Sequence, residues 1–174
     1  MSPASDVLVI AASSGENLQL AGRFGEAARQ QGLSAELLDL TTLDLPLYNP
    51  RLHAAAGVPE TVPALNRRMA AVPRWVICAP EYNGSIPPVL TSAIAWLSVQ
   101  GDDFRLLFNG RPIAIATHSG GGGVEVLTAL RIQLAHLGAH VVGRQLVANR
   151  ARPAADASID DIVARLAQLQ PIQL

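Results

Sequence analysis

A segment near the middle of the chain combines side chains that bind polar ligands. It follows the apolar run at residues 75–79 and reads Pro80-Glu81-Tyr82-Asn83-Gly84-Ser85-Ile86-Pro87-Pro88. The segment supplies a carboxylate, an aromatic ring, an amide and a glycine, Gly84, for which positive φ is expected. This mixture suits a flat polar ligand such as a flavin ring, although Asn-Gly and Pro-Pro are also ordinary turn residues.

A second segment, at residues 12–17, has residue types that bind a phosphate. Small hydroxyl residues and a glycine precede a predicted helix, whose N-terminus presents free backbone N–H groups and the positive end of a dipole. Ser13, Ser14 and Asn17 are therefore candidate phosphate ligands. Serine and asparagine are also the commonest helix caps, and the Glu16 side chain would have to turn away from a bound anion.

The third segment is a loop rich in glycine. It comes directly after an apolar run at residues 112–117 and reads His118-Ser119-Gly120-Gly121-Gly122-Gly123. Four consecutive glycines are costly in backbone entropy, and a turn without a ligand needs only one or two. We therefore expect a ligand or another part of the chain to approach this loop closely, with His118 either touching the ligand or capping the turn.

Apolar runs typical of strands alternate along the chain with longer helical patterns. Strands are predicted at residues 6–12, 35–40, 75–79, 112–117 and 140–142, the last extending to 147 in a second interpretation. Helices are predicted at residues 17–31, 59–71, 88–99, 124–137 and 158–169. Ser158 is expected to cap the last helix, and the aspartates that follow it favour the positive end of the dipole.

This alternation predicts parallel βαβ units with right-handed crossovers. Such units in a chain of 174 residues suggest one domain, residues 1–174, with an α/β flavodoxin-like fold. We expect a three-layer α/β/α sandwich around a five-stranded parallel sheet of order 2-1-3-4-5. The three candidate segments follow the first, third and fourth strands, so they meet at the carboxyl edge of the sheet, where such folds bind ligands.

The composition excludes several classes of function. The net charge is −1 at pH 7, and all 13 basic residues are arginines. The absence of lysine excludes a Walker-type phosphate loop and a pyridoxal Schiff base, because both need a lysine amine. Scattered arginines in a near-neutral chain give no electrostatic footprint for nucleic acid.

The sequence also predicts where the chain resides and what its less common residues do. No segment approaches the roughly 20 apolar residues that cross a bilayer, and the N-terminus lacks the pattern of a signal peptide. We therefore expect a cytoplasmic protein that does not bind membranes. The single cysteine, Cys78, is expected in the core. His136 and His140 have no evident third partner, so they are interpreted as a helix end and a strand start, and no metal site is predicted.

Taken together, these segments resemble the NADPH-dependent FMN reductase family, which includes azoreductases, quinone reductases and chromate reductases. The resemblance covers residues 5–150 and is strongest at residues 80–87. It continues through residues 45–49 and 127–138 and through the helix positions Leu90, Ala93, Ile94, Trp96 and Leu97.

The resemblance implies an enzyme that uses FMN and either NADPH or NADH to reduce a small-molecule electron acceptor, such as a flavin, a quinone or an azo compound, in a ping-pong cycle. By the same resemblance, Ser13 and Asn17 hold the FMN phosphate. The isoalloxazine ring is bordered by the glycine loop, 120–123, and by Pro80, Glu81, Tyr82 and Asn83. Backbone N–H groups of residues 81–84 and 120–123 are candidate donors to the ring. A homodimer or homotetramer is also implied, in which the connection around Tyr48 completes a neighbour's site.

The first loop departs from the family pattern. The family's loop usually reads Gly-Ser-x-Arg and runs on to Ser-x-Asn, whereas the loop that begins with Ala12 and Ser13 is shorter and has no arginine. A guanidinium is among the stronger phosphate ligands. The serines and backbone N–H groups, or an arginine from elsewhere in the chain, would have to compensate.

Three other classes of protein remain open at this point. A flavodoxin-type electron carrier binds the same cofactor without turnover. Such carriers tend to be strongly acidic for docking, so the near-neutral charge of this chain disfavours that role. A response-regulator receiver shares the strand order but needs a lysine, which this chain lacks. A degenerate family member that has lost its cofactor would account for the missing arginine.

Overall fold

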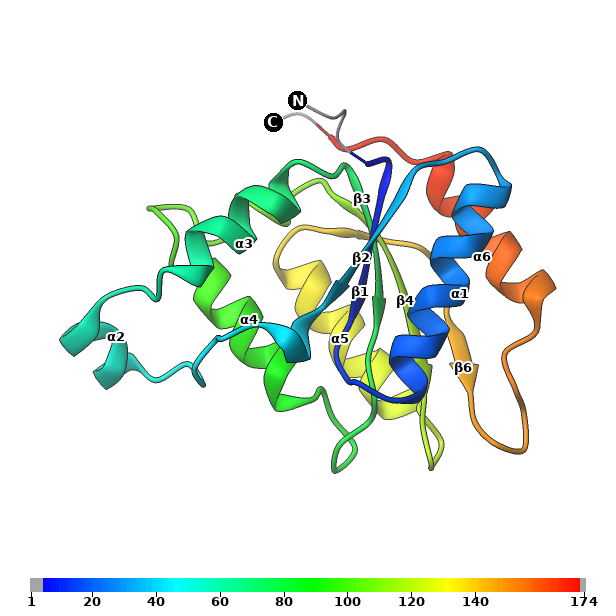
Figure 1. Ribbon diagram of the computed structural model, residues 1–174, viewed down its shortest axis with the longest axis horizontal. Helices are drawn as coiled ribbons and strands as arrows, with labels where there is room; N and C mark the ends of the chain where they lie inside the picture. The colour runs from blue at the N-terminus through cyan, green and yellow to red at the C-terminus, as the bar shows by residue number, and fades with distance from the viewer. Residues whose placement is uncertain (1–4, 173–174) are drawn as a thin grey trace.

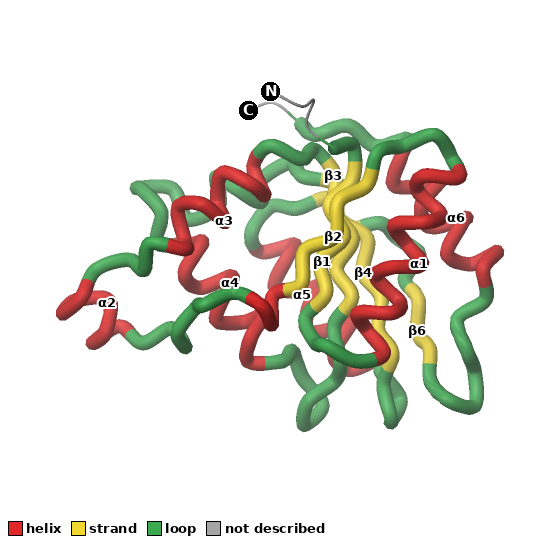
Figure 2. Tube along the Cα trace, in the orientation of Figure 1, coloured by secondary structure: helices red, strands yellow, loops and turns green. Residues whose placement is uncertain are grey.

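The computed structural model describes residues 5–172, in which helices cover both faces of a parallel β-sheet (Figure 1). The strands are β1 (Val7–Ala11), β2 (Ala35–Asp39), β3 (Arg74–Cys78), β4 (Pro112–His118), β5 (His140–Val141) and β6 (Leu146–Ala148). The helices are α1 (Glu16–Gln30), α2 (Pro50–Ala56), α3 (Thr61–Ala70), α4 (Pro88–Ser98), α5 (Val124–His136) and α6 (Asp156–Ala167), with a 3₁₀-helix η1 at Leu40–Thr42. Figure 2 shows the strands stacked between the two helical layers, which is the predicted α/β/α sandwich.

The strand order is β2-β1-β3-β4-β5, as predicted, and β6 also pairs with β4. β5 pairs with the start of β4 through His140 and Pro112, whereas β6 pairs with its end through Ala148 and His118. The last predicted strand is therefore two short strands, separated where the chain bends at Gly143. Since β6 runs to the end of β4, the loop after it reaches the same edge of the sheet as the loops after β1, β3 and β4.

The core consists of two layers, one on each face of the sheet. β1 and β3 are buried at every position, as parallel strands covered on both faces must be. One layer includes Trp75 and Phe108, whose rings meet edge to face at 5.7 Å, and the other includes Phe24 and Cys78. Full burial of one large apolar side chain contributes about 1.5–3 kcal/mol. Cys78 is fully buried, which confirms its predicted place in the core, and this burial raises the pKa of its thiol.

The start of the last helix differs from the prediction. α6 begins at Asp156, and its N-cap, Ala155, makes no side-chain hydrogen bond. Ser158 lies within the first turn, where its hydroxyl accepts a hydrogen bond from Arg144 Nη2 at 3.1 Å. The prediction that Ser158 caps this helix is therefore wrong, and Asp156 is the acidic residue of the first turn.

Helix α2 lies in the long connection between β2 and α3, for which the sequence predicts no helix. Asn49 caps it by accepting a hydrogen bond from the Arg51 N–H at 2.8 Å, and Pro50 occupies its first turn. None of its residues is buried, and the helix stands away from the sheet (Figure 1). The segment before it is tied to α4, because Trp96 Nε1 donates to the Pro46 carbonyl at 2.7 Å.

Two further findings concern residues 5–172. No helix among them is long and apolar enough to cross a membrane. The same residues contain no group of three or more histidine, cysteine, aspartate or glutamate side chains that could hold a metal ion. His136 ends α5 and His140 begins β5, as the sequence indicated.

Candidate functional site

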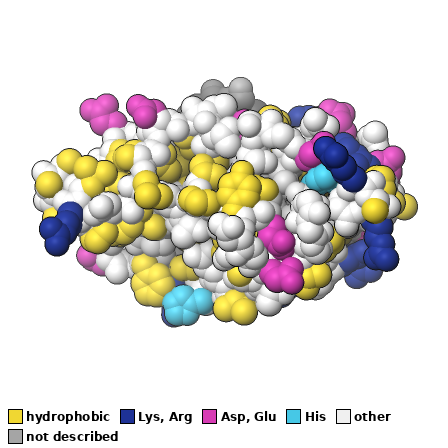
Figure 3. Space-filling view, turned by 90° about the horizontal axis from the view of Figure 1, so that it is seen from below, with side chains coloured by type: hydrophobic (Ala, Val, Ile, Leu, Met, Phe, Trp, Pro, Cys, Tyr) yellow, Lys and Arg dark blue, Asp and Glu magenta, His cyan; other side chains and the backbone are white. Residues whose placement is uncertain are grey.

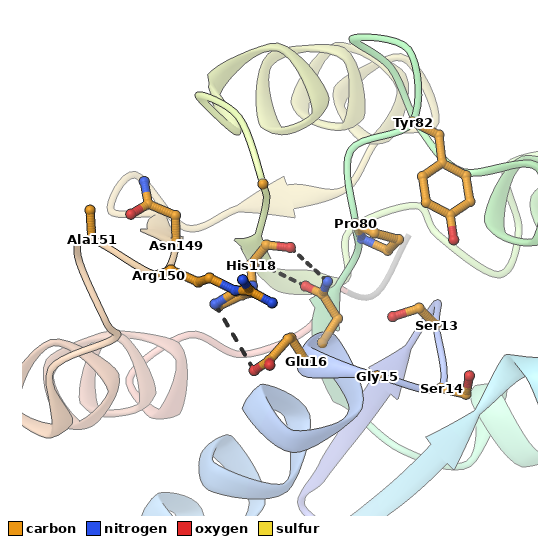
Figure 4. A pocket seen from close by; sticks show the side chains of 12 residues that line it. Ser13, Ser14, Gly15, Glu16, Pro80, Tyr82, His118, Asn149, Arg150 and Ala151 are labelled. Carbon is orange, nitrogen blue, oxygen red and sulfur yellow. Dashed lines mark hydrogen bonds and ion pairs between the residues drawn. The ribbon is translucent and has the colours of Figure 1, made fainter.

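A cleft of about 670 Å³ lies at the carboxyl edge of the sheet. Figure 4 shows it surrounded by loops that follow β1, β3, β4 and β6. The residues that line it are Ser13, Ser14, Gly15, Glu16, Asn17, Pro80, Tyr82, His118, Gly120, Asn149, Arg150 and Ala151. Clefts of roughly 300–1,000 Å³ are typical of small-molecule sites.

The cleft lies where the chain leaves neighbouring strands toward opposite faces of the sheet. β1 pairs with both β2 and β3. The chain leaves β1 toward α1, which belongs to one core layer, and leaves β3 toward α4, which belongs to the other. The two loops therefore diverge and leave a crevice, which is the ligand site of flavodoxin-like sheets.

The two ends of this edge differ in chemistry. Figure 3 looks onto the edge and shows most of the visible arginines, together with acidic side chains, at the end formed by α1 and α6. Hydrophobic side chains gather toward the opposite end, where α2 projects (Figure 3).

The structure divides the predicted site residues into two sets. Those that line the cleft are Ser13, Ser14, Asn17, Pro80, Tyr82, His118 and Gly120. Those that shape the loops without lining the cleft are Glu81, Asn83, Gly84, Ser119, Gly121, Gly122 and Gly123.

The first loop offers unpaired donors at the N-terminus of α1. Gly15 is the N-cap, and no side chain caps the helix. The N–H groups of Glu16 and Asn17 therefore lack an intrahelical acceptor, as the first N–H groups of any helix do. Among the described residues, no hydrogen bond engages the hydroxyls of Ser13 and Ser14. Hydroxyls, N–H groups and the helix dipole together form an anion site.

The Asn17 side chain has a task that the sequence did not indicate. It is only 2% exposed, and it forms two hydrogen bonds with the backbone of His118. Its Nδ2 donates to the His118 carbonyl at 2.9 Å, and its Oδ1 accepts from the His118 N–H at 2.8 Å. The side chain thus fastens the first loop to the end of β4, while the backbone N–H of Asn17 stays in the first turn of α1.

Residues 80–87 form a tight turn that presents Tyr82 to the cleft. Tyr82 and Ser85 exchange two backbone hydrogen bonds, of 3.1 and 3.0 Å. Asn83 and Gly84, between them, have φ of 51° and 69°. Positive φ at both central positions is the geometry of a type I′ turn, which asparagine followed by glycine favours. The predicted positive φ of Gly84 is confirmed, and Tyr82 is left 51% exposed.

Glu81 connects the two loops that follow β3 and β4. Its Oε2 accepts a hydrogen bond from the Val126 N–H, in the first turn of α5, at 3.4 Å. A carboxylate at a helix N-terminus is favourable to the dipole. Glu81, which was predicted to border the ring, therefore bonds the backbone of α5 and does not line the cleft. Glu81 thereby links the loop after β3 to the N-terminus of α5.

The four glycines of the loop after β4 have different reasons to be glycine. Gly123 has φ of +72°, and a Cβ added there would lie 2.8 Å from Thr117 Cγ2. The fold itself therefore requires glycine at this position. Gly120 faces the cleft, and a Cβ there would meet no protein atom within 4 Å. The predicted close approach thus comes from the chain at Gly123 and leaves room for a ligand at Gly120.

Three lining residues, Asn149, Arg150 and Ala151, were not predicted from the sequence. They follow β6, whose end at Ala148 lies beyond the predicted strand. The signal that could have found them is the position of Arg150, an arginine close behind the carboxyl end of the last strand of the sheet. Figure 4 shows its side chain close to His118 and Glu16, whose Nε2 and Oε2 are 4.0 Å apart.

The strand order and the cleft beside β1 and β3 define a flavodoxin-like α/β protein with a nucleotide-sized site. A flavodoxin from the domain Archaea shares this fold, with a TM-score of 0.60 at 10% identity, covering 92% of this chain and 93% of that chain. The chain belongs to the NADPH-dependent FMN reductase family, whose model matches residues 5–153. The predicted family is confirmed, and with it an oxidoreductase class that uses FMN and NAD(P)H.

Two further proteins of known description are similar over most of the chain. An NAD(P)H-dependent FMN reductase of Pseudomonas aeruginosa is 32% identical over 168 residues, which are 88% of each chain. FerB, a flavoenzyme NAD(P)H:(acceptor) oxidoreductase from Paracoccus denitrificans, has the same fold, with a TM-score of 0.75 at 24% identity, covering 95% of this chain and 99% of that chain. A quinone reductase of Escherichia coli K12 is 38% identical over 103 residues, which are 58% of this chain and 53% of that protein.

The residues of the cleft fit FMN. The anion site at α1 matches a phosphate, and the size of the cleft suits a mononucleotide. At both Gly15 and Gly120 a Cβ would project into space that no protein atom occupies within 4 Å. A ligand can therefore approach the backbone closely at both positions, one on each of two loops.

Proposed function

We propose that the chain is an FMN-dependent NAD(P)H oxidoreductase that binds FMN in this cleft. The phosphate binds at the N-terminus of α1, and the ring lies between residues 80–84 and 118–123. The observation that supports this assignment most strongly is that two chemically different groups of residues line one cleft. Unpaired hydroxyl and N–H groups at α1 face the same cleft as Tyr82 and Gly120.

Bound FMN would supply the transfer of two electrons from NAD(P)H to an acceptor. The chain's own residues position the cofactor and polarise it. Tyr82 is an exposed aromatic surface against which a flat ring can pack. Gly120 lines the cleft, and its N–H makes no hydrogen bond within the described residues. A fixed donor of this kind can stabilise negative charge that develops on a ligand.

Not every predicted backbone donor is free to act in this way. The Tyr82 N–H bonds the Ser85 carbonyl, and the Gly121 N–H donates to Ser119 Oγ at 3.1 Å. We therefore assign the donor role in the glycine loop to Gly120.

The acceptor and the order of events form the finer part of the proposal. A flavin, quinone or azo compound fits, because each is a flat molecule that accepts two electrons. NAD(P)H and the acceptor must reach the same bound group, so we expect them to bind in turn, in a ping-pong cycle. Parallel lines in double-reciprocal plots of initial rate would support this order, whereas intersecting lines would contradict it.

We also propose that the active form is a homodimer or homotetramer in which the segment around Tyr48 borders the site of a neighbouring copy. The exposure of α2 supports this association, because the helix buries none of its residues in its own chain. Leu47 and Leu52, on either side of the α2 N-terminus, are 69% and 39% exposed. A monomer at micromolar concentration in sedimentation analysis would contradict it.

The decisive experiment is the visible absorption spectrum of the purified protein, reconstituted with FMN, before and after anaerobic addition of NADPH. We expect a protein-bound flavin band that bleaches with NADPH and returns when a quinone is added. A bound flavin that stays oxidised would favour an electron carrier. Failure to retain FMN would overturn the assignment of this cleft.

A further inference from the structure

The loop after β6 brings a guanidinium to the end of the cleft where the first loop lacks one. Arg150 lines the cleft together with Ser13, Ser14 and Gly15 (Figure 4). Among the lining residues, Arg150 is the one with a permanent positive charge. The sequence places it far from the first loop, and the pairing of β6 with β4 brings it to the same edge of the sheet.

Hydrogen bonds hold the turn that carries Arg150. The Asn149 N–H donates to the Arg152 carbonyl at 3.0 Å, and Asn149 Oδ1 accepts from the Arg152 N–H at 2.8 Å. One residue earlier, the Ala148 carbonyl accepts from the Ser119 N–H at 2.9 Å, which joins the end of β6 to the glycine loop. Arg150 therefore lies in a closed turn at the rim of the cleft.

The Arg150 side chain is available to a ligand. Within residues 5–172 its guanidinium makes no hydrogen bond and no ion pair, whereas Arg144 and Arg165 both pair with Asp161. The carboxylate of the cleft, Glu16, lies 4.0 Å from His118 Nε2 and has a side chain that is 59% exposed. The same cleft therefore carries an unpaired guanidinium and two unpaired hydroxyls, which are donors that a bound anion can engage.

We propose that Arg150 binds the phosphate group of FMN and replaces the arginine that the first loop lacks. The inference rests on the proposed function, because it assumes that FMN binds in this cleft. A planar guanidinium can pair two phosphate oxygens at once, and its bonds to a dianion are among the strongest in proteins. The N–H groups of α1 and the hydroxyls of Ser13 and Ser14 complete the phosphate site.

The test measures the dissociation constants of FMN and riboflavin, by flavin fluorescence, for the wild-type chain and for Arg150→Ala. Riboflavin has the same ring and ribityl chain but no phosphate. We expect Arg150→Ala to weaken FMN binding by roughly 10- to 100-fold, as the loss of hydrogen bonds to a charged group does. Riboflavin affinity should change by less than about twofold, because the ring end of the site is untouched.

Arg152→Ala is the matched control. It removes the same charge from the same turn, and Arg152 does not line the cleft. Its side chain takes no part in the turn, which uses the Arg152 backbone. We expect this variant to bind FMN and riboflavin as the wild-type chain does. A loss of FMN affinity in Arg150→Ala would then reflect the position of Arg150 in the cleft and not the change in net charge.

Three results would overturn the inference. Equal FMN affinity in Arg150→Ala and the wild-type chain would show that the guanidinium does not bind the phosphate. An equal loss for FMN and riboflavin would show a general change of the cleft. Unchanged FMN affinity with a raised KM for NADPH would assign Arg150 to the nicotinamide nucleotide. Should the wild-type chain bind neither flavin, the proposed function itself fails, which is distinct from these results.

Discussion

The two ends of the cleft are built in opposite ways. At the first loop, the hydroxyls of Ser13 and Ser14 are unpaired within the described residues, and so are the first N–H groups of α1. At the other end, several polar groups of the loops at 80–87 and 118–123 are hydrogen-bonded within their own loop or to α5 and β6. The first loop thus keeps donors available for a ligand. The hydrogen bonds of the loops at 80–87 and 118–123 instead fix the shape of their end of the cleft, which we call the slot.

This difference has a general consequence for substitutions. A residue whose polar atoms are unpaired can be replaced with little effect on the free energy of unfolding, but a ligand loses a partner. A residue that bonds its own fold cannot be removed without leaving buried groups unpaired. The two ends should therefore respond differently, and substitutions at each end can test the distinction.

The largest effect is expected at the slot, from Gly123→Ala. A side chain at φ of +72° is strained, and its Cβ would lie 2.8 Å from Thr117 Cγ2. We expect the free energy of unfolding to fall by about 2–4 kcal/mol, measured by urea denaturation. The control is Gly120→Ala, which should lose less than about 0.5 kcal/mol because its Cβ meets no protein atom. Equal losses in the two variants would contradict the distinction drawn within this loop.

A substitution at Asn17, which joins the first loop to the end of β4, is expected to lower the free energy of unfolding nearly as much. Asn17→Ala removes both hydrogen bonds to the His118 backbone and leaves a donor and an acceptor unpaired. We expect a loss of about 2–3 kcal/mol in thermal or urea unfolding. Asn17→Asp keeps the acceptor but sets a carboxylate oxygen against the His118 carbonyl, so it should recover little of that loss. A stable Asn17→Ala that only weakens FMN binding would show that the side chain serves the ligand after all.

A smaller effect is expected where Glu81 joins the loops. Glu81→Gln keeps an acceptor for the Val126 N–H but removes the charge near the N-terminus of α5. We expect a loss of about 0.5–1 kcal/mol, measured by urea denaturation. Glu125→Gln removes a charge from the same first turn without a bond to the other loop, and it should cost less. A larger loss from Glu125→Gln would contradict the importance assigned to the contact between Glu81 and Val126.

The smallest effect on stability is expected at the N-terminus of α1, where we propose that the phosphate binds. Ser13→Ala with Ser14→Ala should leave the free energy of unfolding within about 0.5 kcal/mol of the wild-type value. FMN affinity should nevertheless fall by about 5- to 30-fold, because two hydroxyl donors to the phosphate are lost. Isothermal titration with FMN and with riboflavin would measure this. Destabilisation without a change in affinity would reverse the comparison between the two ends.

The sequence predicted the fold well because its signals are local. Apolar runs such as those of β1 and β3 are buried on both faces, and their alternation with helical patterns leaves few topologies. The weak point was the last strand. β5 and β6 are too short for a periodic pattern, and the pairing partner β4 decides where they begin and end. The helix start at Asp156 was missed because Ser158 has the residue type of a cap but is bonded to Arg144.

The candidate site was predicted in its loops but only partly in its residues. Residue types indicated that Ser13 and Tyr82 would face the cleft, and they do. They could not indicate that Asn17 and Glu81 would be used by the fold, because the partners, His118 and Val126, are distant in sequence. Arg150 was missed because only the pairing of β6 with β4, which is distant in sequence from the first loop, brings it to the cleft.

Because Cys78 is buried in the central sheet, the rate at which its thiol is labelled can report ligand binding at the edge of that sheet. It is the chain's one thiol, it ends β3, and it is fully buried. Thiol reagents attack the thiolate, so labelling of Cys78 must wait for the sheet to open. A ligand that binds only the closed form lowers the open population by the factor 1 + [L]/Kd. The labelling rate of unmodified protein, followed against FMN concentration by mass spectrometry, would therefore yield an affinity without relying on colour, fluorescence or turnover.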